Sequence, residues 1–483
     1  MYSNENILSL LAPLLWVPIA LWGARRWPPA KAAALLLLLP LMFLPELVSF
    51  RLPALPRFGK DQIAIFWLFI GVVLFHRDRL RSVRLGKWIK LAALLLLASH
   101  SITMFLNSDP VSYGAVYIPA HAPRDAVNVL IKNTLNYVLP LVLGAAMFNS
   151  SHDLRVLFRV LVGAALVYSI FQLIELRMSP QFHRWVYGFF QHSFAQTKRG
   201  DGFRPTVFMQ NGLAVAMFTA AGVLAAAGLY KIKIKVFRIP PAFTLGYLWL
   251  ILLLSKSLAA LFYSLMAVPL IVFTRPKTQF RIAVLLAVVV LVYPDARAAG
   301  LVPVEDIRQW VEAEYGEQKV SSLMTRFINE DTLLERSSER PFFGWGTYGR
   351  ASVYSPRSGK EIAIRDGDWI ITWGEFGRFG FFGKYLFLLL PIFLSARQLR
   401  RIRRPSDRRL LAALSLIIGF SVFDFLPNGN FHYLVFALSG ALMGCSNGIV
   451  RHRALRARRK RWESRKVPQS IEEATPVGVA ATT

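Results

Sequence analysis

Long apolar runs separated by short polar segments are the dominant pattern along this chain. Runs of about 17–22 apolar residues are long enough to cross the hydrocarbon core of a membrane as helices. We expect about 13 such spans on this criterion. Their ranges are 7–24, 32–50, 62–76, 88–106, 129–148, 154–174, 211–230, 242–255, 257–274, 280–296, 369–396, 408–426 and 430–449. The predicted fold class is therefore an all-α, polytopic membrane protein.

The spacing of the apolar runs also divides the chain into four parts. Residues 1–296 hold the first ten spans, 297–368 form one long polar loop, and 369–449 hold the last three spans. The tail, 450–483, begins with basic residues and is rich in small and polar ones after Val467, a composition typical of disorder. The sequence shows no internal repeat.

Two segments outside the spans carry apolar residues at helical spacing. One is 180–196, which is rich in Phe and Trp. The other is 304–318, where the apolar residues are Ile307, Trp310, Val311 and Tyr315. An apolar stripe beside a polar face predicts either a helix lying in the membrane interface or a helix packed on neighbouring spans. Both interpretations stay open.

Basic residues concentrate in every second loop between the predicted spans. They cluster at 25–31, 76–81, 231–238, 275–281 and 397–409 and in the tail at 451–466. Cytoplasmic loops of membrane proteins carry an excess of Lys and Arg, so we expect these segments in the cytoplasm. The long loops 107–128, 175–210 and 297–368 then fall on the opposite side. This alternation predicts an extracytoplasmic N-terminus and a cytoplasmic C-terminus.

Composition narrows the class further. The chain has 483 residues, of which 54% are hydrophobic, a share that argues against a soluble protein of this length. The formal charge of +29 lies in short loops and the tail, a distribution that favours anchoring to anionic lipid over binding of nucleic acid. The single cysteine, Cys445, excludes a disulfide within the chain and a cysteine cluster for metal. No basic residue precedes the first apolar run, which we read as a span and not as a cleavable signal.

Four polar clusters are expected to meet near the outer surface. They are 203–212, 255–257, 321–326 with Arg336 and Arg340 following, and 365–368. A cationic side chain at the lipid boundary is costly unless it has a partner or water, so several that converge form an anion site. Diphosphate is the natural ligand because guanidinium groups match phosphate oxygens in pairs.

Each of these residues also has a plainer interpretation. Arg204 could extend to the interface from the end of a span, and Lys256 could only terminate a turn. Arg326 could pair with Glu330, and Arg336 with Glu335 or Glu339. Asp366 and Asp368 could each accept a proton from an attacking hydroxyl, or form an ion pair with Arg365 or Arg340. Glu375 and Arg378 could pair with each other, and Lys384 and Asp424 are further charges within predicted spans.

Several short motifs, in this order along the chain, resemble the O-antigen ligase and O-antigen polymerase family of bacterial membrane glycosyltransferases. They are Arg204 before Asn211-Gly212, the turn Ser255-Lys256-Ser257 where the family often has Ser-Arg, Pro341-Phe342-Phe343-Gly344-Trp345-Gly346, and Gly374-Glu375-Phe376-Gly377 with Gly380. The resemblance covers more than half of the chain, from about Arg204 to the last span. It implies a GT-C-like membrane fold with one large extracytoplasmic loop.

The resemblance implies an enzyme of the bacterial inner membrane. Such enzymes transfer glycan from a polyprenyl diphosphate-linked oligosaccharide donor to a glycan acceptor at the outer face, without nucleotide sugar, usually without metal and with no other cofactor. Arg204 would lie near the donor diphosphate and Arg326 in the large loop. Asp366 stands where many ligases carry a histidine, and Asp-Gly-x-Trp at 366–369 looks more like exopolysaccharide polymerases. Membrane lipid, a chain-length regulator and a flippase are the further partners implied.

The mechanism expected from this resemblance is an inverting transfer. Arg204, Arg326 and Lys256 would stabilise the charge that grows on the leaving diphosphate, and Asp366 or Asp368 would take the proton. Arg336, Arg340 and Arg365 are further candidates for binding the diphosphate or glycan. Trp345 and Trp369 are candidate sugar-stacking surfaces or interface anchors. The alternatives are a ligase that transfers finished glycan to lipid or protein and, in another class, a glycan transporter or flippase.

Overall fold

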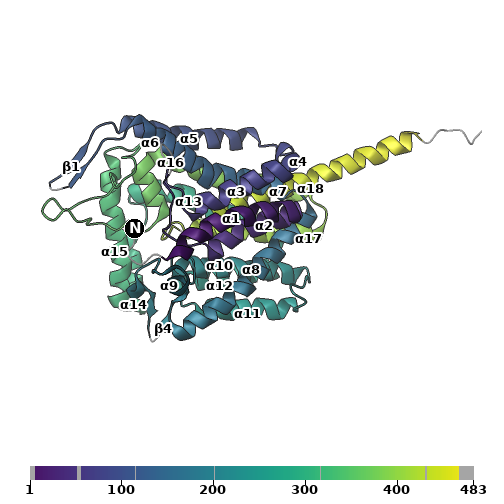
Figure 1. Ribbon diagram of the computed structural model, residues 1–483, viewed down its shortest axis with the longest axis horizontal. Coiled ribbons are helices and arrows are strands. Elements are labelled where there is room, and N and C mark those ends of the chain that lie inside the picture. Colours follow the sequence, from purple (N-terminus) through teal and green to yellow (C-terminus); the bar gives the residue numbers. More distant parts are fainter. Residues whose placement is uncertain are drawn as a thin grey trace, which may run out of the picture.

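The computed structural model describes residues 6–51, 56–114, 116–200, 202–315, 317–429 and 432–466. The protein is mostly helical (72%), and most helices lie side by side along one common direction (Figure 1). Within the described ranges, eight helical stretches are long and apolar enough to cross a membrane. The chain is therefore an all-α membrane protein, as the apolar pattern predicts.

A helix occupies each segment that the apolar pattern predicts as a span. In chain order these helices are α1 (Ile7–Arg26), α2 (Pro29–Phe43), α3 (Lys60–Phe75), α5 (Lys87–Leu106), α6 (Pro123–Asn133) joined through a π-helical turn (Thr134–Val138) to α7 (Leu139–Met147), α8 (Ser151–Met178), α10 (Gly212–Lys231), α11 (Pro241–Leu254), α12 (Leu258–Phe273), α13 (Pro276–Ala298), α16 (Asp368–Gln398), α17 (Pro405–Phe423) and α18 (His432–Lys466). Among them, α2, α11 and α12 are the shorter apolar helices. Helix α10 is the most deeply buried, with 94% of its apolar window inside the bundle.

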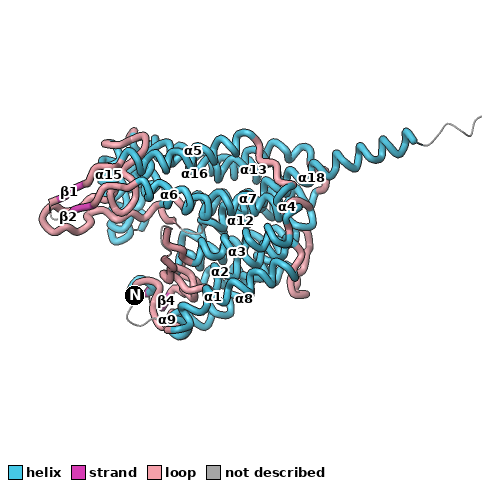
Figure 2. Tube along the Cα trace, turned by 45° about the horizontal axis from the view of Figure 1, so that its top comes forward, coloured by secondary structure: helices cyan, strands magenta, loops and turns pink. Residues whose placement is uncertain are grey.

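Short elements connect these helices at the ends of the bundle (Figure 2). They are α4 (Arg77–Arg81), the hairpin of β1 (Val111–Tyr113) and β2 (Val116–Ile118), α9 (Phe182–Tyr187), a 3₁₀ turn (Phe194–Thr197), the hairpin of β3 (Lys198–Arg199) and β4 (Gly202–Phe203), α14 (Val304–Tyr315), α15 (Glu317–Ser338) and a second 3₁₀ turn (Leu399–Arg401). Both hairpins are antiparallel, with Ser112 opposite Tyr117 in the first and Arg199 opposite Gly202 in the second.

Two sequence predictions about element ends are wrong. The span predicted at 32–50 stops at Phe43, because Pro45 disfavours helical backbone at the residue before it. The single helix predicted at 180–196 is only α9, six residues long. Gly188 ends α9 in the left-handed conformation, with φ of 87° and its N–H bonded to Arg184 O.

The helix predicted at 304–318 is present as α14, which ends at Tyr315. The side chains of Ile307, Trp310, Val311 and Tyr315, on which the amphipathic reading depends, lie outside the described residues, as does the tail after Lys466. The polar segment 297–368 is not one irregular loop, because it contains α14 and α15. In Figure 1, α15 runs across one end of the bundle, roughly perpendicular to the other helices.

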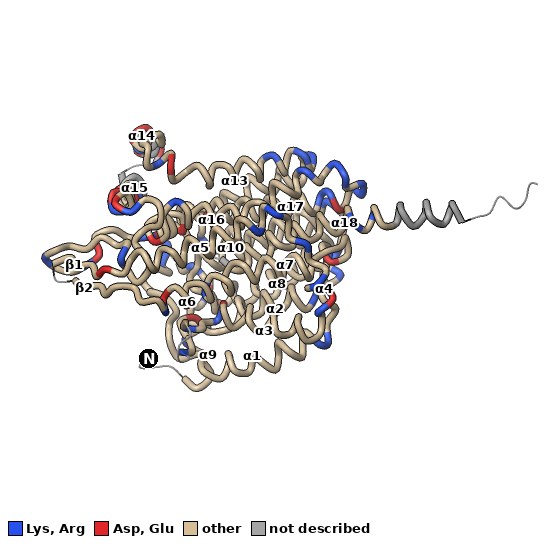
Figure 3. The backbone as a smooth tube through the Cα atoms, turned by 90° about the horizontal axis from the view of Figure 1, so that it is seen from above, with Lys and Arg blue, Asp and Glu red and all other residues tan. Residues whose placement is uncertain are grey.

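Charge separates the two ends of the bundle (Figure 3). Lys and Arg dominate the end that carries α4 and from which α18 extends beyond the bundle. Both signs of charge occur at the end that carries α14, α15 and the β1–β2 hairpin. Asn6, the first described residue, lies at the mixed end, where its side chain donates to Val186 O of α9 at 2.8 Å. The alternation of basic loops along the sequence therefore corresponds to two distinct ends of the folded chain.

Helix α16 is interrupted at Gly377, and the segment 341–346 fills the break. Gly377 has φ of 64° and ψ of −166°, a conformation essentially restricted to glycine. Around the break, Trp345 N and Gly346 N donate to Gly374 O and Glu375 O, and Arg378 N donates to Pro341 O. Irregular backbone at membrane depth is tolerated only when protein satisfies its polar groups, which is what this pairing provides. Two of the motifs singled out in the sequence are thus the two halves of one structural feature.

Candidate active site

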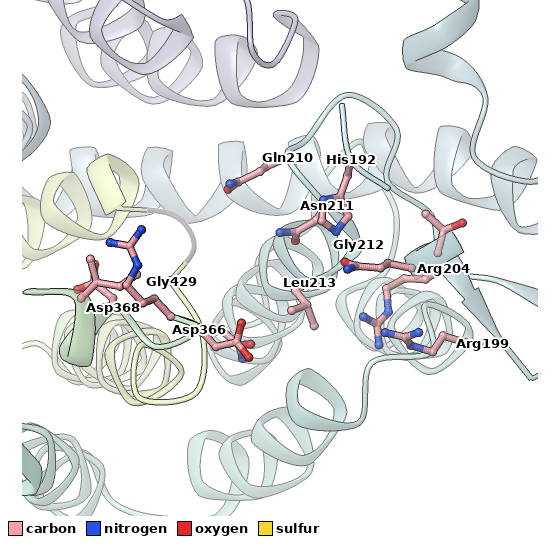
Figure 4. Close-up of a pocket in the computed structure, with 15 residues that line it drawn as sticks. His192, Arg199, Arg204, Gln210, Asn211, Gly212, Leu213, Asp366, Asp368 and Gly429 are labelled. Atoms are coloured by element: carbon pink, nitrogen blue, oxygen red, sulfur yellow. The ribbon is translucent and has the colours of Figure 1, made fainter. Parts of the chain in front are cut away.

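A cavity of about 340 Å³ opens at the mixed-charge end, between the β3–β4 hairpin and the starts of α10 and α16 (Figure 4). The residues that line it come from three stretches of chain. They are His192, Gln196, Thr197, Arg199, Arg204, Gln210, Asn211, Gly212 and Leu213; Arg365, Asp366, Asp368 and Ile371; and Asn428 and Gly429. The structure thus brings Arg204 together with Arg365, Asp366 and Asp368, as the sequence predicts.

A network of polar contacts fixes Arg204 at the rim of this cavity. Its Nη2 donates to Lys256 O at 2.9 Å, and its backbone N–H donates to Thr197 O. Its side-chain stem lies over Gly212, where a Cβ would meet Arg204 Cδ at 2.2 Å. Arg199 lies beside Arg204 on the same side of the cavity (Figure 4).

The buried carboxylate of Glu175, at the end of α8, holds the loop that follows Arg204. Its Oε2 accepts from the backbone N–H groups of Thr206 and Val207, both at 2.8 Å. Its Oε1 accepts from those of Gln181 and Phe182, both at 3.1 Å. One side chain therefore ties two outer segments to the helix bundle, a role that the apolar pattern of α8 does not reveal.

Lys256 supports the arginines and does not line the cavity. It adopts a left-handed conformation with φ of 52°, in the turn between α11 and α12. Its Nζ donates to Arg199 O at 3.1 Å. Since its carbonyl also accepts from Arg204, Lys256 holds the β3–β4 hairpin in place.

Two helix N-termini point their positive ends at the cavity. Asn211 caps α10 by accepting from Ala214 N at 2.9 Å, and Gly212 and Leu213, in the first turn, line the cavity. Helix α16 begins at Asp368, also on the cavity wall. The first N–H groups of a helix have no partner within it and carry partial positive charge. At α16, Asp368 N and Trp369 N donate to Asn428 O and Phe425 O, both at 3.4 Å, so of the two ends it is the start of α10 that favours a bound anion.

The charge of the lining groups is positive overall. Arg199, Arg204 and Arg365 contribute cations, and Asp366 is the one carboxylate on the wall that is not neutralised by a buried lysine. Burial, with a further contribution from Arg199, lowers the pKa of Arg204 to about 10, so its guanidinium group remains charged at neutral pH. Among the described residues, Arg204 Nε has no hydrogen-bond partner. A multivalent anion would supply the missing acceptors.

Asp368 is engaged in a buried ion pair. Its carboxylate accepts from Lys384 Nζ at 2.7 and 2.8 Å and from the Tyr385 hydroxyl at 2.6 Å. Its partner is thus neither Arg365 nor Arg340, the two that the sequence suggests. A carboxylate saturated in this way is poorly suited to accept a proton, so the geometry favours the structural interpretation of Asp368 over that of a general base.

Asp366 is half-exposed and lies between two cavities. It lines the cavity of Arg204 and also a neighbouring one of about 210 Å³, whose wall includes Arg326, Tyr293 and Glu330. Arg326 Nε lies 4.0 Å from Asp366 Oδ2. Arg326 therefore does not pair with Glu330, which instead lies 3.4 Å from Arg297 Nε. The two arginines proposed at the diphosphate occupy adjacent cavities that share Asp366.

Arg336, Arg340 and Trp345 form a separate cluster. Trp345 is 7% exposed, and the guanidinium carbons of Arg336 and Arg340 lie 3.2 and 4.2 Å from its ring centroid. Arg336 pairs with Glu339 at 2.7 Å, and Arg340 pairs with Asp109 at 2.8 Å. The structure thus places these three residues away from both cavities, with the indole ring packed against cations.

Trp369 and Arg365 also have defined structural contacts. Trp369 is fully buried and packs edge-on against Tyr293 at 5.0 Å, so its ring is not presented to either cavity. Arg365 lies 3.5 Å from Glu375, and Arg378 pairs instead with Asp295 at 3.1 Å. The suggested Glu375–Arg378 pair is therefore wrong, because the break at Gly377 turns the two side chains toward different partners.

Sequence reasoning missed several residues that build the site. One of them is the hairpin arginine Arg199, which lines the cavity beside Arg204. Asn428 and Gly429, which follow α17, complete the wall opposite the β3–β4 hairpin. In the sequence, nothing in the spacing of Lys198-Arg199 and Arg204 marks Arg199 as part of a site. In the structure, Arg199 is identified by its position beside Arg204 in the cavity. Across the described side chains, no group of three His, Cys, Asp or Glu residues could hold a metal ion.

Comparison with known proteins adds no assignment. A scan against models of known protein families finds no match, and no curated protein matches the chain.

Proposed function

We propose that this protein is a membrane glycosyltransferase that polymerises lipid diphosphate-linked glycan repeat units at the outer face of a bacterial inner membrane. The observation that carries the proposal is the cationic cavity of Arg199, Arg204 and Arg365 at the bundle end opposite the basic one. Lys and Arg mark the cytoplasmic end of membrane proteins, so this cavity is on the outer side. The same argument gives an outer N-terminus and a cytoplasmic C-terminus, and the apolar runs give about 13 spans between them.

The cavity geometry suits a donor in which a diphosphate links the lipid to the sugar. Arg204 and the N-terminus of α10 bind the diphosphate, while Arg199 and Arg365 balance its charge. These groups stabilise the negative charge that grows as the bond between sugar and diphosphate breaks. Such stabilisation needs groups that are already in place, which the contacts of Arg204 with Lys256 and Thr197 provide.

Asp366 is the candidate base because it lies where the two cavities meet. The acceptor glycan binds on the side of Arg326 and Tyr293, and its hydroxyl oxygen attacks the anomeric carbon from the face opposite the diphosphate. The new glycosidic bond forms as the carbon–oxygen bond to the diphosphate breaks. The hydroxyl proton passes to Asp366, and the polyprenyl diphosphate leaves with the bonding electrons. Attack from the opposite face inverts the anomeric configuration.

The test is polymer formation from a labelled lipid diphosphate-linked repeat unit by purified protein in vesicles. We expect a ladder of longer glycans without any added energy source. Arg204→Ala should lower the rate by about 100-fold or more, because it removes a preorganised cation. Lys198→Ala is the matched control, since Lys198 is an exposed neighbour in the same hairpin and does not line the cavity.

The outcomes separate the competing functions. Normal activity of a well-folded Arg204→Ala protein would remove the proposed role of this residue. Transfer of one preformed glycan to a lipid or protein acceptor, without chain growth, would identify a ligase. Movement of the labelled lipid across the bilayer without any new glycosidic bond would identify a transporter and overturn the proposal.

A further inference from the structure

A further cavity lies on the side of the bundle, between α2 and α8, and is separate from the arginine cavity. Its volume is about 470 Å³, and its long wall is apolar, with Leu35, Leu39, Met42, Val160 and Val167 among the lining residues. We call it the α2–α8 groove. Helices α2 and α8 contact each other directly, so the groove is a surface furrow along their junction.

Three cations surround one end of the α2–α8 groove. Lys31 is at the start of α2, Arg159 is in the first part of α8, and Lys235 is in the turn after α10. All three side chains are exposed. Among the described residues, no carboxylate oxygen lies within 4.0 Å of their nitrogens. This end belongs to the basic end of the bundle, because α2 and α8 both begin there.

The turn that carries Lys235 is held in a strained shape over the groove. Lys233, Phe237 and Arg238 all have positive φ, between 49° and 64°, and Val236 forms a bridge with Ile239. Phe237 is 66% exposed, and its ring edge lies against Gly163 of α8, where a Cβ would meet Cζ at 3.2 Å. Left-handed backbone at several non-glycine residues persists only where surrounding contacts determine it. The turn therefore presents an aromatic ring and a cation together at the groove.

We propose that the α2–α8 groove binds an anionic phospholipid of the cytoplasmic leaflet. The acyl chain lies along the apolar wall, and the headgroup phosphate contacts Lys31, Arg159 and Lys235. Charge complementarity selects this occupant, since an apolar furrow alone would accept any lipid chain, whereas three unpaired cations at its basic end require an anion there. An exposed aromatic ring at the same level suits the headgroup region.

The far end of the groove reaches the segment that carries Arg204. Phe43, the last groove residue of α2, packs against Phe208 and Tyr168 with ring centroids 6.0 and 6.1 Å apart. The Tyr168 hydroxyl accepts from Phe208 N at 3.1 Å. A bound acyl chain therefore packs against the same aromatic cluster that supports residues 204–208. The lipid site itself does not depend on the proposed enzyme activity.

The test is native mass spectrometry of the full-length protein in detergent, titrated with phosphatidylglycerol or with phosphatidylcholine. We expect phosphatidylglycerol to bind more tightly. The triple variant Lys31→Ala/Arg159→Ala/Lys235→Ala should weaken that binding about tenfold or more, because each cation near a headgroup contributes separately. The matched control is Arg77→Ala/Arg81→Ala/Lys277→Ala, which removes three exposed basic residues that do not line the groove.

A second variant tests the apolar wall without changing charge. Val167→Trp should fill the groove and displace the lipid, whereas Ile170→Trp, on the same helix and equally lipid-facing but outside the groove, should leave binding unchanged. Equal binding of the two lipids, or equal loss in the triple variant and its control, would overturn the proposal. Full competition by inorganic phosphate would also overturn it, because it would show an ion site without a lipid chain.

Discussion

At the residue scale, two neighbouring aspartates have different environments and therefore different roles. Asp368 is buried against Lys384 and Tyr385, whereas Asp366 is 48% exposed at the junction of two cavities. A buried ion pair is sensitive to loss of one partner, because the remaining charge has no water to solvate it. The first aspartate thus maintains structure, and the second is accessible from both cavities.

Substituting each aspartate separates these roles. Asp368→Asn should destabilise the protein by about 3–5 kcal/mol, because it leaves the Lys384 ammonium group buried without a counterion. Asp366→Asn should leave the melting temperature unchanged and lower polymer formation by about 100-fold. Thermal unfolding in detergent, beside the activity assay, measures both. Equal stability of Asp368→Asn and the exposed control Asp306→Asn would contradict the structural role.

His183 in α9 should make stability depend on pH. Its Nδ1 donates to Phe189 O at 2.8 Å, while its Nε2 accepts from Glu46 N at 3.1 Å, so the ring is neutral. Burial lowers the pKa of His183 from 6.5 to about 4. Between these values the unfolded state binds more protons than the folded state, so stability should fall as the pH decreases from 6.5 to 4. The full loss is about 3 kcal/mol.

Melting curves between pH 7 and pH 4 provide the measurement for His183. His183→Gln, which cannot titrate, should flatten this part of the pH dependence. His192→Gln serves as the control, because His192 is exposed and lies nine residues further along the same segment. An unchanged pH profile in His183→Gln would show that other groups cause the acid sensitivity.

At the element scale, the interrupted helix α16 joins the arginine cavity to the rest of the bundle. Its first part begins at the cavity with Asp368, and its second part carries Lys384, the partner of Asp368. The backbone of 341–346 seals the break at Gly377. The break therefore allows the non-helical segment 341–346 to pack into the bundle.

Gly377→Ala should disrupt this arrangement. Its φ of 64° with ψ of −166° is unfavourable for alanine, and the added Cβ would lie 2.4 Å from the carbonyl carbon of Phe342. We expect a loss of at least about 2 kcal/mol. Gly246→Ala is the control, because Gly246 lies inside helix α11 and an added Cβ there meets nothing within 4 Å. Equal melting temperatures for the two variants would contradict the account of the break.

The helices could be predicted from the sequence, but their pairings could not. The apolar runs located the long apolar helices because burial in lipid imposes a minimum length, but they gave no sign of the polar helix α15. The end of α2 at Phe43 could also be predicted from the sequence, because Pro45 disfavours helical backbone at the residue before it. Hydropathy alone extends this span to residue 50. In contrast, nothing local indicates that 341–346 pairs with 374–378, because hydrogen bonds between distant segments leave no periodic signal.

The candidate site could be predicted from the sequence only in part. Arg204, Arg365, Asp366 and Asp368 do meet in one cavity, since all four lie near the start of a long helix at the same bundle end. The substrate roles suggested for Trp345 and Trp369 conflict with their burial, because an aromatic residue near an interface can face either protein or solvent. The partner of Asp368 was not identifiable, as Lys384 is four turns away along an interrupted helix.

At the scale of the whole molecule, the separation of charge predicts the orientation of the chain. The basic end should face the cytoplasm, and the end with the arginine cavity should face outward. The chain has a single, buried cysteine, Cys445, which simplifies labelling. In a Cys445→Ala background, Ser358→Cys should react with a membrane-impermeant maleimide in intact spheroplasts, and Arg400→Cys only after lysis. The reverse pattern would place the cavity in the cytoplasm.

The central claim is that the arginine cavity holds the diphosphate of a lipid-linked sugar. The most direct measurement is a cryo-electron microscopy map of the protein with a donor analogue whose anomeric oxygen is replaced by a methylene group. We predict phosphate density within hydrogen-bond distance of Arg204 and the first N–H groups of α10, with the anomeric carbon facing Asp366. Phosphates bound at the basic end, or a sugar directed away from Asp366, would contradict the account.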